Sequence, residues 1–264
     1  MRIITAGGDL RQKTAIKILE EKGFEIINYR PYTTEITKDD ILLLPTPVTR
    51  DKIHLTAHST NEPICIEEIK KLFSKAKLVI GGNYENQYVT DILKRDDFAY
   101  YNAVPTAEGA IKIAIENTDT TLWNSNILVC GFGRVAKILI SRLVGFCPNL
   151  CVAARNNAAF SLLDSFGVKR IHCAELAQHI NNFDIVFNTA DATLFNDTLL
   201  NFVKKDSLFI ELATNNIGFS KEFLGSDYIR FISAPALPGK IAPVTAGKIL
   251  AETVLNILRE NNLY

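Results

Sequence analysis

Short apolar runs alternate with longer amphipathic stretches along nearly the whole chain. In the first half, apolar runs predict strands at residues 2–6, 24–29, 41–44, 77–80 and 98–101, and amphipathic stretches predict helices at 10–22 and 65–74. In the second half, strands are predicted at 127–130, 151–154, 168–171, 185–188, 208–212 and 229–232, with helices at 134–143, 158–166 and 174–180. Strands that alternate with helices are typical of βαβ units and parallel sheets.

A second strand–glycine turn–helix unit begins only at residue 126, which predicts two domains. We expect an α/β protein with two Rossmann-like domains, each containing a parallel sheet. Residues 1–103 would form a substrate domain (flavodoxin- or Rossmann-like) and residues 121–238 a domain that binds NAD(P). Helices within 104–120 (starting after Pro105) and 239–264 would bridge the domains, and the last one would complete the first domain. The segment 45–63 is expected to be mostly loop.

The strongest local signal is the sequence G-F-G-R-V-A at residues 131–136, between a predicted strand and a predicted helix. This G-x-G-x-x-A spacing is a form of the dinucleotide-binding fingerprint. The first glycine permits a tight turn, the second lets a pyrophosphate approach the backbone, and Ala136 lets the helix pack closely. The amides at the helix N-terminus favour the pyrophosphate anion. The alternative is a structural turn or a degenerate site.

The end of the next strand indicates which dinucleotide to expect. An acidic residue there would bind the ribose 2′-hydroxyl of NAD, but the strand 151–154 is followed by Arg155 and two asparagines. A guanidinium can pair with a 2′-phosphate, so the sequence favours NADP(H); the alternative is a solvated arginine that stacks on adenine. The predicted cofactor-binding residues are Gly131, Phe132, Gly133, Arg134, Val135, Arg155, Asn156, Asn188, Thr189, Ala190 and Ala213.

Charge and cysteine usage narrow the possible environment and partners. The 264 residues include 29 Lys and Arg and 29 Asp and Glu, so the formal charge is zero. This balance gives no electrostatic reason to expect nucleic acid or an anionic membrane as a partner. The five scattered cysteines form no C-x-x-C, so we expect reduced thiols, as in the cytosol. With no apolar signal-peptide core and no apolar window of about 18 residues, a cytoplasmic protein is expected.

Three further segments resemble one protein family. They read G-G-D-L-R-Q at residues 7–12, R-D-D-F-A-Y-Y-N-A-V-P-T-A-E-G-A at 95–110 and L-P-G-K-I-A-P-V-T-A-G at 237–247. In this order they are similar to motifs in the family of the dipicolinate synthase A subunit, and they are more specific than the glycine fingerprint. The resemblance implies a cytoplasmic sporulation enzyme that works with a flavoprotein-like B subunit. The pair would oxidise dihydrodipicolinate to dipicolinate (pyridine-2,6-dicarboxylate) and pass the hydride to NADP. A homo-oligomer is expected.

Two segments depart from the family pattern. Residues 45–76 look like a shortened and different version of the family's first-domain loops. After Glu211-Leu212-Ala213, where relatives tend to carry an arginine, this chain continues Thr214-Asn215-Asn216-Ile217. A dicarboxylate favours bidentate arginine partners. Two alternatives therefore stay open, a dehydrogenase for another small carboxylic acid and a non-catalytic protein that binds NADP(H).

The candidate substrate contacts come from three segments that a cleft between the domains would bring around the nicotinamide. Arg11 follows the first glycine turn, where a guanidinium and helix amides can bind a carboxylate; the alternative is a helix cap at Asp9 with Arg11 on the surface. Thr106 and Glu108 are expected in the first turn of the linker helix, where capping is the alternative. The predicted substrate set is Gly8, Asp9, Arg11, Thr106, Glu108, Leu237, Pro238 and Gly239.

The sequence assigns no catalytic acid or base. His54 and His58 have metal-ligand spacing, but Thr56, Ser59 and Thr60 argue against a helix and no third ligand is placed nearby, so no metal is expected. The D-2-hydroxyacid dehydrogenases share the two-domain plan but need a histidine base before the last helix. No histidine follows His179, which argues against that activity.

Overall fold

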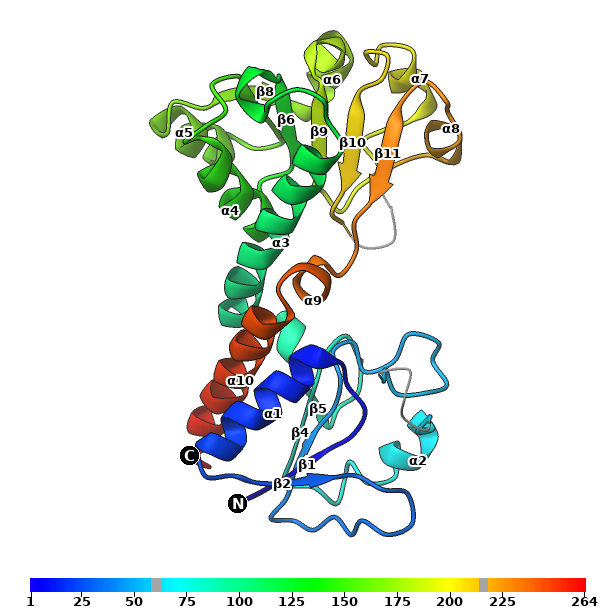
Figure 1. The fold of residues 1–264 in the computed structure, drawn as a ribbon, viewed down its shortest axis with the longest axis vertical. Helices are drawn as coiled ribbons and strands as arrows, with labels where there is room; N and C mark the ends of the chain where they lie inside the picture. The colour runs from blue at the N-terminus through cyan, green and yellow to red at the C-terminus, as the bar shows by residue number, and fades with distance from the viewer. Residues whose placement is uncertain (58–62, 214–217) are drawn as a thin grey trace. The chain divides into compact units, whose positions relative to one another are not determined.

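The structure is a computed structural model that describes residues 1–57, 63–213 and 218–264. The chain divides into two compact units. The first unit comprises Met1–Asn102 and Pro238–Tyr264, and the second comprises Ala103–Leu237. Within the described residues each unit forms one parallel sheet with helices packed against it, as Figure 1 shows. The predicted α/β fold class, with two Rossmann-like units, is confirmed.

The first unit contains a five-stranded sheet of order β2-β1-β3-β4-β5. Its strands are β1 (Arg2–Thr5), β2 (Glu25–Asn28), β3 (Ile41–Leu43), β4 (Leu78–Gly81) and β5 (Val89–Asp91), followed by the 3-10 turn η1 (Ile92–Lys94). Its helices are α1 (Leu10–Glu21), α2 (Ile66–Lys70) and α10 (Pro243–Glu260). Most of the predicted strands and helices of this half are present with small shifts of their ends.

The two faces of this sheet are covered by different helices. Successive residues of a strand point to opposite faces. Ile3 of β1 accordingly packs in a core cluster with α1 and α10, while Ile4 packs in another cluster with α2. Figure 1 shows α10, the end of the chain, lying beside α1. The C-terminal helix therefore completes the core that the N-terminal strands begin.

The second unit contains a six-stranded sheet of order β11-β10-β9-β6-β7-β8. Its strands are β6 (Ile127–Cys130), β7 (Leu150–Ala154), β8 (Lys169–His172), β9 (Ile185–Asn188), β10 (Leu208–Glu211) and β11 (Arg230–Ser233). Its helices are α4 (Arg134–Leu143), α5 (Asn157–Ser165), α6 (Leu176–His179), α7 (Asp197–Leu200) and α8 (Lys221–Leu224), with 3-10 turns η2 (Leu122–Asn124), η3 (Cys173–Glu175) and η4 (Ile180–Asn182). The strand order reverses between β6 and β9, and parallel sheets bind ligands at such a switch point.

The segment between the two sheets differs from the prediction. The strand predicted at residues 98–101 is wrong, because a single helix α3 (Asp96–Glu116) runs through it with Pro105 in its interior. Asp96 and Asp97 stand in its first turn, where negative charge favours a helix start. Phe98 packs into the core that contains α10, so its apolar character serves one face of a helix. The short helix α9 (Leu237–Ile241) was not predicted.

Among the helices that the structure describes, none is long and apolar enough to cross a membrane. The five cysteines are free, and burial raises the pKa of the Cys147 and Cys151 thiols to about 11. Thiols with such pKa values are poor nucleophiles at neutral pH. These two cysteines therefore contribute packing rather than chemistry.

Candidate functional site

The glycine turn after β6 has the backbone that a dinucleotide site requires. Gly131 has a φ of +102°, and a Cβ there would lie 2.5 Å from Thr189 Oγ1 and 3.2 Å from the amide nitrogen of Ala190. Gly133 is the N-cap of α4 and has no side-chain capping bond. A Cβ on Gly133 would meet nothing within 4 Å, so the space in front of this helix start is open. Gly131 is thus required by the fold, whereas Gly133 leaves room for a ligand.

A pocket of about 370 Å³ opens at the carboxyl ends of β6, β7 and β9. This is the edge of the sheet where the strand order reverses. Its walls come from the glycine turn, the end of β7 and the turn after β9. From the predicted cofactor set, the pocket brings together Gly131, Phe132, Gly133, Arg155, Asn156, Thr189 and Ala190, and its other lining residues are Ala154, Ala159, Cys173, Asp191, Ala192 and Leu194.

Arg155 is exposed at the end of β7 and lines this pocket. Its carbonyl lies 3.2 Å from Nε2 of His172, which ties the backbone there to β8. No carboxylate in the described part of the chain forms an ion pair with its guanidinium. Asn156 is the N-cap of α5, and its Oδ1 accepts a hydrogen bond of 2.8 Å from the amide of Ala159. The cation therefore remains available to an anionic ligand, while Asn156 shapes the pocket.

The other predicted cofactor residues lie around the pocket rather than among its lining. Arg134 and Val135 open α4, and Ala213 follows β10. Asn188, the last residue of β9, is fully buried. Its Oδ1 accepts a hydrogen bond of 3.2 Å from the amide of Ala190, so it reaches the pocket only through that turn.

Glu211, which the sequence reasoning did not select, is a fully buried carboxylate at the end of β10. Asn188 Nδ2 donates to both of its oxygens, at 3.1 and 2.9 Å, and the amide of Ala213 donates to Oε1 at 2.8 Å. Burial raises the pKa of Glu211, although these hydrogen bonds act in the opposite direction. The available signal was a single carboxylate ending the otherwise apolar strand L-F-I-E.

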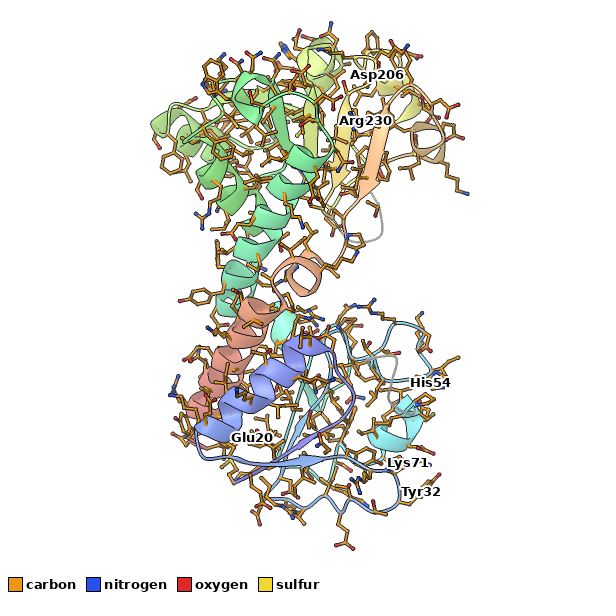
Figure 2. All side chains as sticks on the ribbon, in the orientation of Figure 1. Glu20, Tyr32, His54, Lys71, Asp206 and Arg230 are labelled. Atoms are coloured by element: carbon orange, nitrogen blue, oxygen red, sulfur yellow. The ribbon has the colours of Figure 1, made fainter. Side chains whose placement is uncertain are left out.

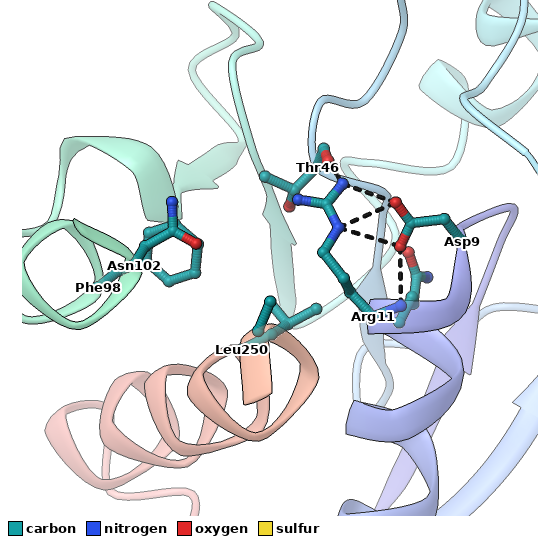
Figure 3. A pocket seen from close by; sticks show the side chains of 8 residues that line it. Asp9, Arg11, Thr46, Phe98, Asn102 and Leu250 are labelled. Atoms are coloured by element: carbon teal, nitrogen blue, oxygen red, sulfur yellow. Dashed lines mark hydrogen bonds and ion pairs between the residues drawn. The ribbon is translucent and has the colours of Figure 1, made fainter. Parts of the chain in front are cut away.

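In the first unit, Asp9 and Arg11 form one structure at the start of α1. Asp9 Oδ1 accepts a hydrogen bond of 2.9 Å from the amide of Arg11, which caps the helix. Its Oδ2 lies 2.7 Å from the guanidinium of Arg11, whose side chain is only 14% exposed. The guanidinium also donates to the carbonyl of Thr46, as Figure 3 shows. Capping by Asp9 is therefore correct, but Arg11 is not a free surface residue.

Gly239 lies beside the Arg11 side chain. A Cβ on Gly239 would be 3.2 Å from Arg11 Nε, so the structure brings the 7–11 turn and the L-P-G segment together. A cavity of only about 10 Å³, room for roughly one water, adjoins them. Gln12 lines this cavity with a buried Oε1 that has no hydrogen-bond partner among the described residues. Figure 3 shows Phe98, Asn102 and Leu250 on the opposite side.

A larger hollow of about 410 Å³ has Asp9 among its lining residues in the same unit. It is lined by Arg50, Asp51, His54 and the segment 55–57 as well as Asp9. His54, labelled in Figure 2, is held by Asp51, with 2.9 Å between Nδ1 and Oδ2. This hollow, rather than the small cavity, has the volume for a small organic acid in the first unit.

Some predicted substrate residues do not lie where expected. Thr106 and Glu108 are inside α3, which begins at Asp96, so the predicted helix N-terminus at Thr106 is wrong. The cause is the apolar run before Pro105, which continues the helix instead of forming a strand. Thr106, Glu108 and Leu237 belong to the second unit. The remaining members, Gly8, Asp9, Arg11, Pro238 and Gly239, belong to the first unit.

Two sequence features fall outside the described residues. These are the segment Thr214-Asn215-Asn216-Ile217, which departs from the expected family pattern, and His58, which has metal-ligand spacing from His54. In the part of the chain that is described, no group of three or more His, Cys, Asp or Glu side chains could hold a metal ion.

The fold and the glycine-turn pocket define the class of two-unit α/β proteins with a dehydrogenase-like fold. A transhydrogenase from Sinorhizobium meliloti has this fold, with a TM-score of 0.70 at 17% identity, covering 100% of this chain and 95% of that chain. No family model matches the sequence.

Similarity at higher sequence identity is found to the A subunit of dipicolinate synthase. The A subunit of dipicolinate synthase from Bacillus subtilis (strain 168) is 29% identical over an alignment of 287 residues, gaps included. The alignment covers 98% of this chain and 96% of that protein. The crystal structure of the A subunit of dipicolinate synthase from Bacillus halodurans superposes with a TM-score of 0.89 at 27% identity, covering 97% of both chains. The resemblance to the family of the dipicolinate synthase A subunit is therefore confirmed over nearly the whole chain.

Proposed function

We propose that the chain is an oxidoreductase that acts as the A subunit of a dipicolinate synthase. It would oxidise dihydrodipicolinate to dipicolinate, with NADP as the hydride acceptor, together with a flavoprotein-like B subunit. The observation that carries this proposal is the pocket at the switch point of the second sheet, which joins the open Gly133 turn to the exposed cation of Arg155. Similarity to the A subunit of dipicolinate synthase over 98% of the chain supports the substrate class.

The residues of the pocket fit a nicotinamide dinucleotide phosphate. The amides at the start of α4 suit a pyrophosphate, because that helix start has no side-chain cap and the space in front of Gly133 is open. Arg155 suits the 2′-phosphate, and no acidic residue stands at the end of β7 to favour a free 2′-hydroxyl. When bound, NADP supplies a two-electron hydride acceptor.

The proposed reaction requires the protein mainly to bind the substrate and NADP and to orient them for hydride transfer. Conversion of a dihydropyridine to a pyridine removes one hydride, which passes to NADP, and one proton, which a base or water takes up. The substrate carries two carboxylates, so it needs cationic partners. In the first unit Arg11 lies against Gly239 and Asp9, and Arg50 lines the neighbouring hollow. We propose that these two arginines provide the positive charge for the carboxylates.

The test is hydride transfer by the purified chain, alone and with the flavoprotein-like partner, followed through the absorbance of the reduced nicotinamide. Dihydrodipicolinate should give NADPH and dipicolinate with NADP, and turnover should be slower with NAD. If NADPH binds but neither preparation turns over dihydrodipicolinate or related small acids, the chain is a non-catalytic NADP(H)-binding protein. If another acid is oxidised in preference, the oxidoreductase assignment stands and the substrate assignment fails.

A further inference from the structure

The carboxyl ends of three neighbouring strands place one residue each beside the dinucleotide pocket. Asn188 of β9 is in register with Cys130 of β6 on one side and with Glu211 of β10 on the other. Figure 1 shows these strands side by side in the second unit. Asn188 and Glu211 are fully buried, and neither is among the residues that line the pocket. A polar pair thus lies in the interior directly behind the pocket wall.

The burial of Glu211 is not explained by an ion pair. Its hydrogen-bond donors are the Asn188 side chain and the backbone amides of Leu212, Ala213 and Gly218. No lysine, arginine or histidine in the described chain pairs with it. A buried carboxylate without a cation carries a large desolvation cost. An apolar residue at this strand end would avoid that cost, but it would leave the side-chain amide of Asn188 and the backbone amides of Leu212, Ala213 and Gly218 without this acceptor.

The hydrogen bonds lead from Glu211 to the pocket wall. Asn188 Nδ2 donates to both carboxylate oxygens, at 3.1 and 2.9 Å, and at 3.4 Å to the carbonyl of Ala190, and its Oδ1 accepts a hydrogen bond of 3.2 Å from the backbone nitrogen of Ala190. The neighbouring Thr189 hydroxyl donates to the carbonyl of Cys130 at 2.8 Å. The same hydroxyl would be 2.5 Å from a Cβ on Gly131. The turn at residues 189–190 is therefore fixed against the glycine turn on one side and against Asn188 on the other.

We propose that Glu211 is a positioning residue of the dinucleotide pocket. By accepting both hydrogen bonds from Asn188 Nδ2, it sets the orientation of the Asn188 amide and thereby holds the turn at residues 189–190 at the distance from Gly131 that the bound dinucleotide requires. The inference rests on the proposed dinucleotide function and deepens it.

The substitution Glu211→Gln tests this orientation without changing the size of the side chain. Both carboxylate oxygens lie within 3.1 Å of Asn188 Nδ2, so either orientation of the new amide places an NH₂ against an NH₂. Rotation of the Asn188 amide relieves this contact, and the Ala190 amide then loses its acceptor. The exchanged pair N188D/E211Q restores the pattern with the same net charge. In that pair the carboxylate at position 188 would accept hydrogen bonds from the NH₂ group at position 211 and from the backbone of Ala190, while the amide oxygen at position 211 accepts from the backbone of Ala213.

Thermal unfolding first checks that each cofactor-free variant is folded. The experiment then measures the dissociation constants of NADPH and NADH for the folded variants by titration calorimetry. Glu211→Gln should raise both dissociation constants by about tenfold, the size of one lost buried hydrogen bond, because the turn serves a part common to both cofactors. The exchanged pair should return both values to within about threefold of the wild type. Glu222→Gln, an exposed residue of the same unit, should leave them unchanged and serves as the matched control.

Each outcome of this experiment either supports or overturns the positioning role of Glu211. Unchanged dissociation constants in a folded Glu211→Gln variant overturn the inference and leave the proposed function intact. If Glu211→Gln does not fold, the exchanged pair decides: folding with restored affinity supports positioning, and failure to fold or to bind overturns it. If the wild-type chain binds neither nucleotide, the proposed function fails and this inference fails with it.

Discussion

The guanidinium of Arg11 lies 2.7 Å from Oδ2 of Asp9, the residue that caps the same helix. One carboxylate thus holds both the backbone and the side chain of Arg11. Burial raises the pKa of Asp9, but its hydrogen bonds with Arg11 outweigh this and leave the pKa below its ordinary value. The positive charge of Arg11 is consequently shared with Asp9 until a stronger acceptor competes for it.

Substitution of Arg11 should therefore weaken binding of the substrate and leave binding of the cofactor unchanged. Arg11→Ala should raise the KM for dihydrodipicolinate and leave the NADPH dissociation constant within about twofold, since a lost ground-state contact acts on binding. Asp9→Asn should act in the opposite direction, because asparagine still caps the helix but releases the guanidinium. Steady-state kinetics of the two variants check both signs. An unchanged KM in Arg11→Ala would place the substrate elsewhere.

Arg155 should distinguish the two nicotinamide cofactors. Arg155→Ala removes the charge-assisted contact to the 2′-phosphate that we propose, which would be worth about 1.5–3 kcal/mol, so NADPH affinity should fall about ten- to a hundredfold while NADH affinity changes little. Titration calorimetry with both nucleotides measures this difference. Arg142→Ala, an exposed arginine on α4 of the same unit, is the control. Equal losses for both nucleotides in Arg155→Ala would show that Arg155 does not contact the phosphate.

Substitution of the two glycines of the fingerprint should change different properties, stability for Gly131 and NADPH affinity for Gly133. Gly131→Ala places a Cβ at a φ of +102° and 2.5 Å from Thr189 Oγ1, which should lower the stability of the cofactor-free protein by about 1–3 kcal/mol. Gly133→Ala meets nothing within 4 Å, so its stability should be unchanged although NADPH binding weakens. Gly145→Ala, equally unobstructed, should change neither property. Normal NADPH affinity in Gly133→Ala would mean that no phosphate approaches this turn.

These features also show which parts of the structure the sequence could predict. The glycine turn was predictable because its constraint is local: a fixed spacing between an apolar strand and a helix. The strand predicted at residues 98–101 failed because a short apolar run fits a strand and a buried helix face equally well. The position of Phe98 in the core with α10 decides between them, and that contact joins residues far apart in sequence.

The Asn188–Glu211 pair could not be predicted for a related reason. The two residues meet only because β9 and β10 are adjacent and in register, which depends on the strand order of the whole sheet. Arg11, predicted to contact the substrate, lies near the L-P-G segment, but its pairing with Asp9 depends on the side-chain geometry at the helix start. Sequence patterns therefore predicted where residues lie along helices and strands. The side chains that each residue contacts could be identified only from the three-dimensional fold.

The start of α3 should make the first unit sensitive to acid. Arg95 pairs with Asp97 at 2.9 Å and with Glu260 at the end of α10 at 2.6 Å, and Asn256 donates to Asp97. The hydrogen bonds from Arg95 are the main cause that lowers the pKa of Asp97 from 3.8 to about 2. A carboxylate whose pKa is lower in the folded state stabilises that state above its unfolded pKa, and this contribution disappears as the pH falls through the folded value.

We therefore expect the unfolding free energy of the wild type to fall by about 1 kcal/mol through this group between about pH 4 and pH 2, after allowance for solvent screening of a partly exposed pair. Asp97→Asn should be less stable than the wild type at pH 7, and the difference should shrink toward pH 2. Denaturation followed by circular dichroism at several pH values measures this difference. Asp39→Asn, exposed in the same unit, should show none of it. A difference for Asp97→Asn that stays constant across this pH range would contradict the assignment, because the carboxylate would then contribute through packing alone.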